Sequence, residues 1–122
     1  MSLKPNNKES PMLKETIEEL TKISRENDNP FWRDIAKRLN GSRKNYASLN
    51  LGKIDKLIED GEIVVVPGSL LGAGYFEKKA TLSALKFSRS AQEKIKQSGS
   101  TLKTLVELAR EHPKGTNLKI LR

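Results

Sequence analysis

The segment that most constrains the fold is an unbroken apolar run near the middle of the chain, Ile63–Val66. Its four residues are all β-branched, a type that is enriched in strands. The run does not alternate with polar residues, as a strand with one solvated face would. It therefore predicts a strand over Glu62–Pro67 that is buried on both of its faces.

A glycine-rich loop is predicted directly after this strand, beginning at Pro67. Glycine lets the main chain lie close to another surface and reach positive φ without strain. Two adjacent lysines follow, and they indicate that this surface carries negative charge. The loop is interpreted as a place where main chain and ammonium groups meet phosphate, with a purely structural set of turns as the alternative. The residues concerned are Gly68, Gly72, Gly74, Lys78 and Lys79.

The rest of the sequence predicts two N-terminal helices followed by short strands and helices. Ser10-Pro11 and Asn29-Pro30 are typical helix starts, because an N-cap side chain precedes a proline at the first helical position. The first helix is expected at 11–27, and the second ends at Gly41. The later elements are expected as strands at 46–51, 75–76, 81–87 and 117–121, helices at 52–58 and 89–98, and a strand and helix within 100–111.

The chain is predicted to form one domain with an N-terminal tail. Residues 1–9 are polar without periodicity, which predicts a flexible basic tail. Residues 10–122 are expected to form the domain, helical over 10–41 and mixed strand and short helix over 42–122. A chain of 122 residues can bury one core of modest size.

A weak internal repeat runs through the second half, in which a short strand leads directly into a short helix. Two apolar triplets with the same spacing lie 51 residues apart. A true repeat predicts an irregular coil of strand and helix turns instead of one wide sheet, but short amphipathic helices also share such spacing by chance. The triplets are Leu51, Ile54 and Leu57 and then Leu102, Leu105 and Leu108.

Positive charge is concentrated in two segments. The net charge is +8, which indicates a polyanionic partner. Residues 33–53 and residues 78–96 each hold six basic residues and one acidic residue, a net charge of +5 in each. Acidic residues gather in the first helix and at 55–62, so one side of the molecule is expected to be near neutral and another strongly positive. Solvated helix faces are the alternative explanation.

Several classes of function are excluded by the composition. The chain has no cysteine and a single histidine, His112, so disulfides, thiol catalysis, histidine-cluster metal sites and a catalytic role are not expected. The glycine-rich loop lacks the Gly-Lys-Ser/Thr ending of a phosphate-binding P-loop. No apolar run approaches the ~20 residues that span a bilayer, and the N-terminus lacks the apolar core of a signal peptide. We expect no enzyme, no cofactor and no membrane association.

A basic loop is predicted between the second helix and the next strand. Arg43 offers a planar fork to phosphate or guanine, and Lys44 offers a point charge. Tyr46 stacks on an unpaired base or packs inward, and the sequence leaves both open. The chain has six aromatic residues and no interleaved aromatic platform, which favours a binder of folded RNA over a reader of single strands.

The segments described so far resemble the archaeal and eukaryotic family of large-subunit ribosomal protein number eighteen. The first matching run is Lys37-x-Leu39-x-x-Ser42-Arg43-x-x-Tyr46-Ala47-x-Leu49-Asn50-Leu51-x-Lys53-Ile54. The second is Val64-Val-Val-Pro-Gly-x-x-Leu-Gly-x-Gly74, followed later by Phe87-Ser-x-x-Ala91 and His112-Pro-Lys-Gly115. The resemblance covers about residues 30–122.

The resemblance implies an α/β fold, an irregular superhelix of strand-strand-helix turns shared with bacterial large-subunit protein number fifteen, here preceded by two N-terminal α-helices. It implies a structural constituent of the large ribosomal subunit that binds and stabilises folded large-subunit ribosomal RNA without catalysis. The chain would act as a monomer in the cytoplasmic ribosome, beside neighbouring large-subunit ribosomal proteins, with residues 10–122 as the RNA-binding domain. The short length favours an archaeal member.

Together, the charge pattern and the resemblance select a set of RNA-binding residues. They are Arg33, Lys37, Arg38, Arg43, Lys44, Lys53, Gly68, Gly72, Gly74, Lys78, Lys79, Lys86 and Arg89. The alternative function is a protein–protein interaction module that uses Phe31, Trp32 or Tyr75 on an exposed patch.

Overall fold

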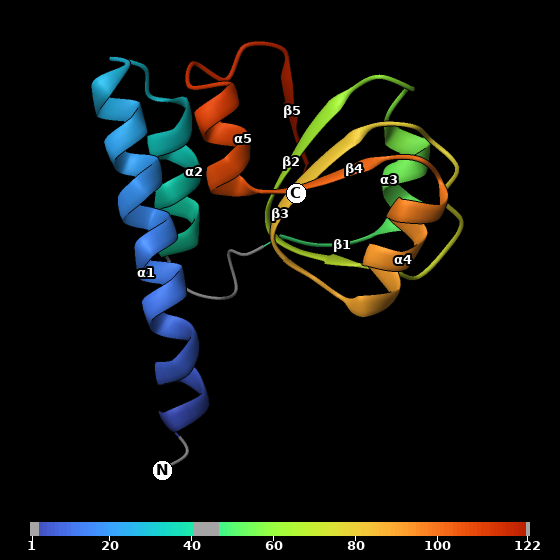
Figure 1. Ribbon diagram of the computed structural model, residues 1–122, viewed down its shortest axis with the longest axis horizontal. Helices are drawn as coiled ribbons and strands as arrows, with labels where there is room; N and C mark the ends of the chain where they lie inside the picture. The colour runs from blue at the N-terminus through green and yellow to red at the C-terminus, as the bar shows by residue number, and fades with distance from the viewer. Residues whose placement is uncertain (1–2, 41–46, 122) are drawn as a thin grey trace.

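The computed structural model describes residues 3–40 and 47–121, with side chains from residue 13 onward. Its fold is mixed α/β, with a helical hairpin followed by a parallel sheet and interspersed helices (Figure 1). The hairpin consists of α1 (Leu3–Glu26) and α2 (Phe31–Asn40). The later elements are β1 (Ala47–Asn50), α3 (Leu51–Leu57), β2 (Ile63–Leu71), β3 (Thr81–Phe87), α4 (Arg89–Gln97), β4 (Thr101–Thr104), α5 (Leu105–Glu111) and β5 (Leu118–Ile120).

The sheet is built around β2. Its strand order is β1-β2-β3-β4, β5 also pairs with β2, and every pairing is parallel. β5 pairs with Ile63–Val65 and β1 pairs with Gly68–Leu71, so these two strands share one edge of β2 and β3 occupies the other. The two halves of β2 therefore have different neighbours.

The predicted end of the strand at Pro67 is wrong, because β2 continues to Leu71. Pro67 lies between the residues paired with β5 and those paired with β1, where the register with β3 also shifts. A proline has no N–H to donate, and a strand tolerates it at such an irregularity. The predicted strand at 75–76 is also absent, and Phe76 is instead a buried residue of an irregular connection.

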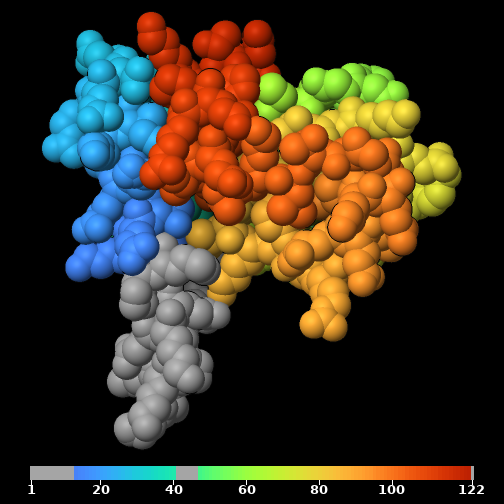
Figure 2. Space-filling view, in the orientation of Figure 1, coloured from blue at the N-terminus to red at the C-terminus, as the bar shows by residue number. Residues whose placement is uncertain are grey.

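The expected burial of the apolar run on both faces is confirmed. Val64 and Val66 belong to one buried cluster, and Val65 belongs to the other. Helices α3 and α4 contribute to the first cluster, and α1, α2 and α5 contribute to the second. We call α1, α2 and α5 the helical layer. Figure 2 shows the hairpin at one end of the visible face and α4 at the other, with α5 and the C-terminal residues between them.

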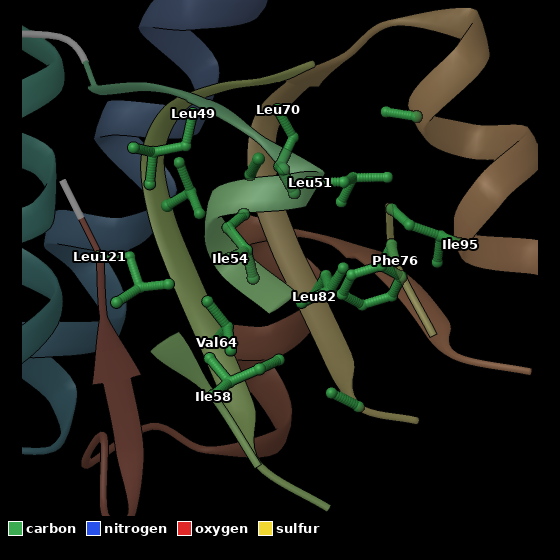
Figure 3. Close-up of a cluster of buried hydrophobic side chains, with 14 of the residues drawn as sticks. Leu49, Leu51, Ile54, Ile58, Val64, Leu70, Phe76, Leu82, Ile95 and Leu121 are labelled. Atoms are coloured by element: carbon green, nitrogen blue, oxygen red, sulfur yellow. The ribbon is translucent and has the colours of Figure 1, made fainter. Parts of the chain in front are cut away.

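The first cluster holds the strands and short helices together. Leu51 and Ile54 of α3 and Ile95 of α4 are buried against β2 and β3 (Figure 3). Phe76 joins them from the irregular connection between β2 and β3, where its side chain is largely buried. Side chains from strands, helices and the connection thus exclude water from this face of the sheet.

The second cluster surrounds Trp32, which is fully buried. The indole Nε1 of Trp32 donates a hydrogen bond to the carbonyl oxygen of His112 at 2.8 Å. Phe31 packs edge-on against it, with ring centroids 4.9 Å apart. The idea that Trp32 lies on an exposed interaction patch is therefore wrong, because its apolar ring and its one donor are both satisfied inside the protein.

Helix α1 begins earlier than predicted. It starts at Leu3 and passes through Pro11, although a proline inside a helix loses one backbone hydrogen bond. The flexibility of residues 1–9 stays a prediction. The second start signal is confirmed in position, since Asn29 Oδ1 accepts a hydrogen bond from the N–H of Phe31 at 3.0 Å.

The strand-to-helix corner recurs, but not in the predicted register. Asn50 leads directly into α3 and Thr104 leads directly into α5, while Ser88 joins β3 to α4. Leu51 begins α3, whereas its predicted counterpart Leu102 lies in β4. Leu57 is exposed whereas its counterpart Leu108 is buried, and Leu102 is exposed whereas its counterpart Leu51 is buried. Equal spacing in the two triplets therefore does not mean equal burial.

Candidate nucleic-acid interface

Strands β1, β2 and β3 end together at one edge of the sheet, which we call the carboxyl edge. Asn50 lies opposite Leu71, and Leu70 lies opposite Phe87. In parallel sheets, ligands commonly bind outside the carboxyl ends of the strands. The predicted residues gathered at this edge are Lys53 in α3, Gly72 and Gly74 after β2, Lys86 at the end of β3 and Arg89 at the start of α4.

The predicted glycines are required by close packing inside the protein. A Cβ on Gly68 would lie 2.0 Å from the carbonyl oxygen of Ala47, and one on Gly74 would lie 2.6 Å from the Cα of Gly52. Gly74 also has φ of +92°, which L-residues with side chains rarely adopt. The structural alternative therefore accounts for these glycines, and their contact with RNA stays a prediction.

Hydrogen bonds to its main chain hold the connection from β2 to β3 in place; we call this connection the crossover (residues 72–80). The carbonyl oxygen of Ala73 accepts a hydrogen bond from the N–H of Gly52 at 3.0 Å. The carbonyl oxygen of Gly74 accepts one from Lys94 Nζ at 2.7 Å. Asp55 Oδ1 accepts the N–H groups of Glu77 and Lys78 at 3.0 and 3.3 Å. Most of these bonds join residues about 20 positions apart in the chain.

Lys78 and Lys79 lie at the opposite edge of the sheet from Arg89. They are followed by Ala80 and then by Thr81, which pairs with the first residues of β2 and β4. Seven residues of β3 at ~3.3 Å each separate the two edges by about 20 Å. The N–H of Lys79 donates to Asp60 Oδ1 at 2.9 Å, so an acidic side chain lies next to this pair. The basic segment 78–96 is thus divided between two edges.

The other predicted cations belong to the helical hairpin or lie outside the described residues. Arg33 and Lys37 are exposed on α2, and Arg38 is half-buried there. The residues of the predicted basic loop, Arg43, Lys44 and Tyr46, fall outside the described residues.

Ion pairs distinguish two groups of cations. Within residues 13–40 and 47–121, the ion pairs are Lys103–Glu111, Arg110–Glu19 at 3.5 Å and Lys119–Glu62 at 3.5 Å. Lys53 and Arg89, two cations of the predicted RNA-binding set, do not take part in them. The paired cations are neutralised by the protein itself, while Lys53 and Arg89 are exposed at the carboxyl edge.

Sequence reasoning missed three residues that shape this edge. Gly52 packs closely against Gly74, and Asp55 accepts a backbone N–H of the crossover. Lys94 donates a hydrogen bond to the carbonyl oxygen of Gly74. No local pattern marks them, because each acts on a residue about 20 positions away in the chain.

A hydrogen bond to Glu77 raises the pKa of Tyr75, with smaller contributions from burial and from the charges of Glu77 and Asp55.

Two features of other function classes are absent from the described residues. They contain no group of acidic or histidine side chains that could hold a metal ion. In the same part of the chain, no helix is long and apolar enough to cross a membrane.

Comparisons with known proteins identify one family. The family described as ribosomal protein 60S L18 and 50S L18e matches residues 4–122. Large ribosomal subunit protein eL18 of Picrophilus torridus is 51% identical over 122 residues, covering 100% of both chains. The eL18 protein of Thermoplasma acidophilum is 51% identical, covering 96% of this chain and 98% of its own, and that of Methanospirillum hungatei is 43% identical, covering 96% and 97%.

Proposed function

The chain belongs to the eL18 family of large ribosomal subunit proteins, and we therefore propose that it stabilises folded large-subunit ribosomal RNA by direct contact. It is a structural, non-enzymatic component of the ribosome, with archaeal homologues. The proposal adds how it binds: basic side chains neutralise phosphates, and the shape of the RNA supplies most of the specificity.

The observation that carries this proposal is the contrast between paired and unpaired cations. Lys53 and Arg89 are exposed at the carboxyl edge and form no ion pair with a carboxylate of the described residues. Cations of this kind release the counterions of RNA when they reach its phosphates, which provides a favourable free energy of binding. The exposed cations of α2 would extend the interface onto the helical layer.

The finer architecture is part of the same proposal. The parallel pairings and the three strand-to-helix corners support a core wound as an irregular superhelix of strand-strand-helix turns. Such a core presents several corners along one edge, where RNA helices would dock. Surfaces that RNA leaves uncovered would contact neighbouring large-subunit proteins, with the chain present as a monomer.

The first experiment measures binding to transcribed large-subunit ribosomal RNA as a function of salt. The variant Lys53→Ala/Arg89→Ala should bind more weakly, and the slope of log affinity against log salt should fall by about 0.7–0.9 for each phosphate that the variant no longer neutralises. The matched control is Lys103→Ala/Arg110→Ala, which removes the same two residue types from positions already paired with Glu111 and Glu19. An unchanged slope in the first variant would refute the phosphate contacts.

A second variant maps the opposite edge. Lys78→Ala/Lys79→Ala should also flatten the salt dependence if ribosomal RNA reaches the amino ends of the strands. A wild-type slope for this variant, with a reduced slope for Lys53→Ala/Arg89→Ala, would confine the interface to the carboxyl edge.

Sedimentation of cell lysate tests the setting. The protein should move with the large subunit and leave it after ribonuclease digestion. Migration as a small unbound protein at low salt would contradict the proposal, and an association that survives ribonuclease and high salt would favour the protein-interaction module instead.

A further inference from the structure

A groove of about 560 Å³ lies between the crossover and α4. Tyr75 and Glu77 line it from the crossover, and Lys94 and Gln97 line it from α4. Its volume falls within the ~300–1,000 Å³ that is usual for sites that hold small ligands. The groove thus has room for one planar group with polar partners on both sides.

Tyr75 is the exposed aromatic side chain of this region. Of the five aromatic residues that the structure describes, Trp32 and Phe76 are buried and Phe31 and Phe87 are half-buried, whereas Tyr75 is 66% exposed. An aromatic ring in that position offers a face for stacking with a nucleic-acid base.

The main chain on both sides of Tyr75 is fixed. Gly74 packs against Gly52 and accepts the hydrogen bond from Lys94, while the N–H of Glu77 is held by Asp55. Phe76 is buried in the first cluster. Because the backbone is ordered before a ligand arrives, stacking on Tyr75 costs little additional conformational entropy.

The charge around the groove suits a nucleotide. The Lys94 ammonium has three donors, of which Gly74 takes one. Lys53 follows Gly52, the residue that contacts Gly74, so the main chain of a second basic residue lies near the Gly74 end of the groove. The Glu77 carboxylate can accept hydrogen bonds from the amino group of a base.

We propose that this groove receives one unpaired nucleotide of large-subunit ribosomal RNA, with its base stacked on Tyr75 and its phosphate beside Lys94. The inference rests on the proposed function and deepens it, since it names an extruded base as a ligand in addition to folded RNA shape. It also assigns a role to an aromatic residue that the basic set does not include.

The test compares Tyr75→Ala and Tyr75→Phe in binding to transcribed large-subunit ribosomal RNA. Tyr75→Ala should weaken binding by about 5- to 150-fold, the range expected for loss of one stacked base, with an unchanged salt slope. Tyr75→Phe keeps the ring and should bind nearly as wild type. The matched control is Leu57→Ala, which shortens another exposed apolar side chain outside the groove and should not change binding.

Ultraviolet cross-linking identifies the contact directly. In the wild-type complex, mass spectrometry should find a nucleotide attached to the peptide that contains Tyr75. Equal affinity of Tyr75→Ala and wild type would overturn the inference while leaving the salt-dependent binding, and hence the proposed function, intact. A cross-link from Tyr75 to a neighbouring protein in purified subunits would overturn it in favour of a protein contact. If wild type fails to bind the RNA at all, the proposed function fails first.

Discussion

Helices α3 and α5 have the same length and each follows directly from a short strand, but different interactions stabilise their first turns. Each has seven residues. At α5, Thr104 and Glu107 form a capping box in which each side chain accepts the backbone N–H of the other residue. At α3, the side chain of Asn50 makes no capping hydrogen bond, and Gly52 packs instead against Gly74.

The charges of the two corners differ in the same sense. Around α5, Arg110 pairs with Glu19 and Lys103 pairs with Glu111. At α3, Lys53 is exposed and has no ion pair with a described carboxylate. The α5 corner is stabilised by side-chain hydrogen bonds and ion pairs, whereas the α3 corner depends on packing against the crossover. The α3 corner also keeps an exposed cation, Lys53, that is accessible to a partner. The comparison supports the proposal that the α3 corner faces the RNA, whereas the α5 corner is stabilised within the protein.

The largest expected effect comes from the buried residue of each corner. Ile54→Ala and Leu108→Ala should each lower the free energy of unfolding by about 2–5 kcal/mol, because both side chains are fully buried. Leu57→Ala should cost less than about 0.5 kcal/mol, since Leu57 is 45% exposed. Urea denaturation of the three variants checks this. A large loss in Leu57→Ala would contradict the difference in burial between Leu57 and its counterpart Leu108 in the two apolar triplets.

The next effect concerns the glycine contact that replaces a cap at α3. Gly74→Ala should destabilise the protein by about 2–4 kcal/mol, because it combines strain at positive φ with a clash against the Gly52 backbone. Gly61→Ala is the matched control, since Gly61 has φ of +89° but no atom within 4 Å of an added Cβ. It should cost about 1 kcal/mol, the strain alone. Equal losses in denaturant titrations would show that the Gly52–Gly74 contact is not tight.

A smaller effect separates the two caps. Thr104→Ala removes a side-chain cap and should cost about 1 kcal/mol. Asn50→Ala should cost clearly less, because Asn50 has no capping hydrogen bond to lose. Thermal unfolding of both variants measures the difference. If Asn50→Ala were as costly as Thr104→Ala, the two corners would be capped alike in solution.

The smallest effect is the pH dependence of the α5 cap. The hydrogen bond from the Thr104 backbone lowers the pKa of Glu107 below its ordinary value of 4.5. A carboxyl with a lowered folded-state pKa adds stability above the unfolded pKa and loses it as the pH falls through the folded value. The stability difference between wild type and Glu107→Ala should therefore be greatest above about pH 4.5 and shrink at lower pH. Denaturation curves from pH 7 to 3 check the sign, and a difference that grows toward pH 3 would contradict it.

Sequence reasoning was most successful where local chemistry decides the structure. The β-branched run predicted the central strand and its two buried faces, and Val64 and Val65 confirm this in different clusters. The helix expected at 89–98 is confirmed as α4, and the side chain of Ser88 at its start accepts the N–H of Ala91 at 3.1 Å. In both cases the residues that determine the element lie within it or next to it.

The failures have a common physical cause. Pro67 was expected to end the strand, but it is tolerated because β2 exchanges one neighbouring strand for another at that point. Lys79 and Arg89 were grouped by sequence, but parallel pairing of β2 with β3 places them at opposite edges. The contribution of the predicted RNA-binding residues stays a prediction that the salt-dependence experiment addresses.

The sequence by itself determined the buried strand, the start of α2, the family and the excess of positive charge, because each of these depends on neighbouring residues or on composition. Only the tertiary structure decided why the glycines are needed and which cations stand together. Gly68, Gly72 and Gly74 each touch a segment far away in the chain, and the strand register decides the edge on which each lysine lies. A one-dimensional pattern does not contain such contacts, because they exist only after parallel strands have paired.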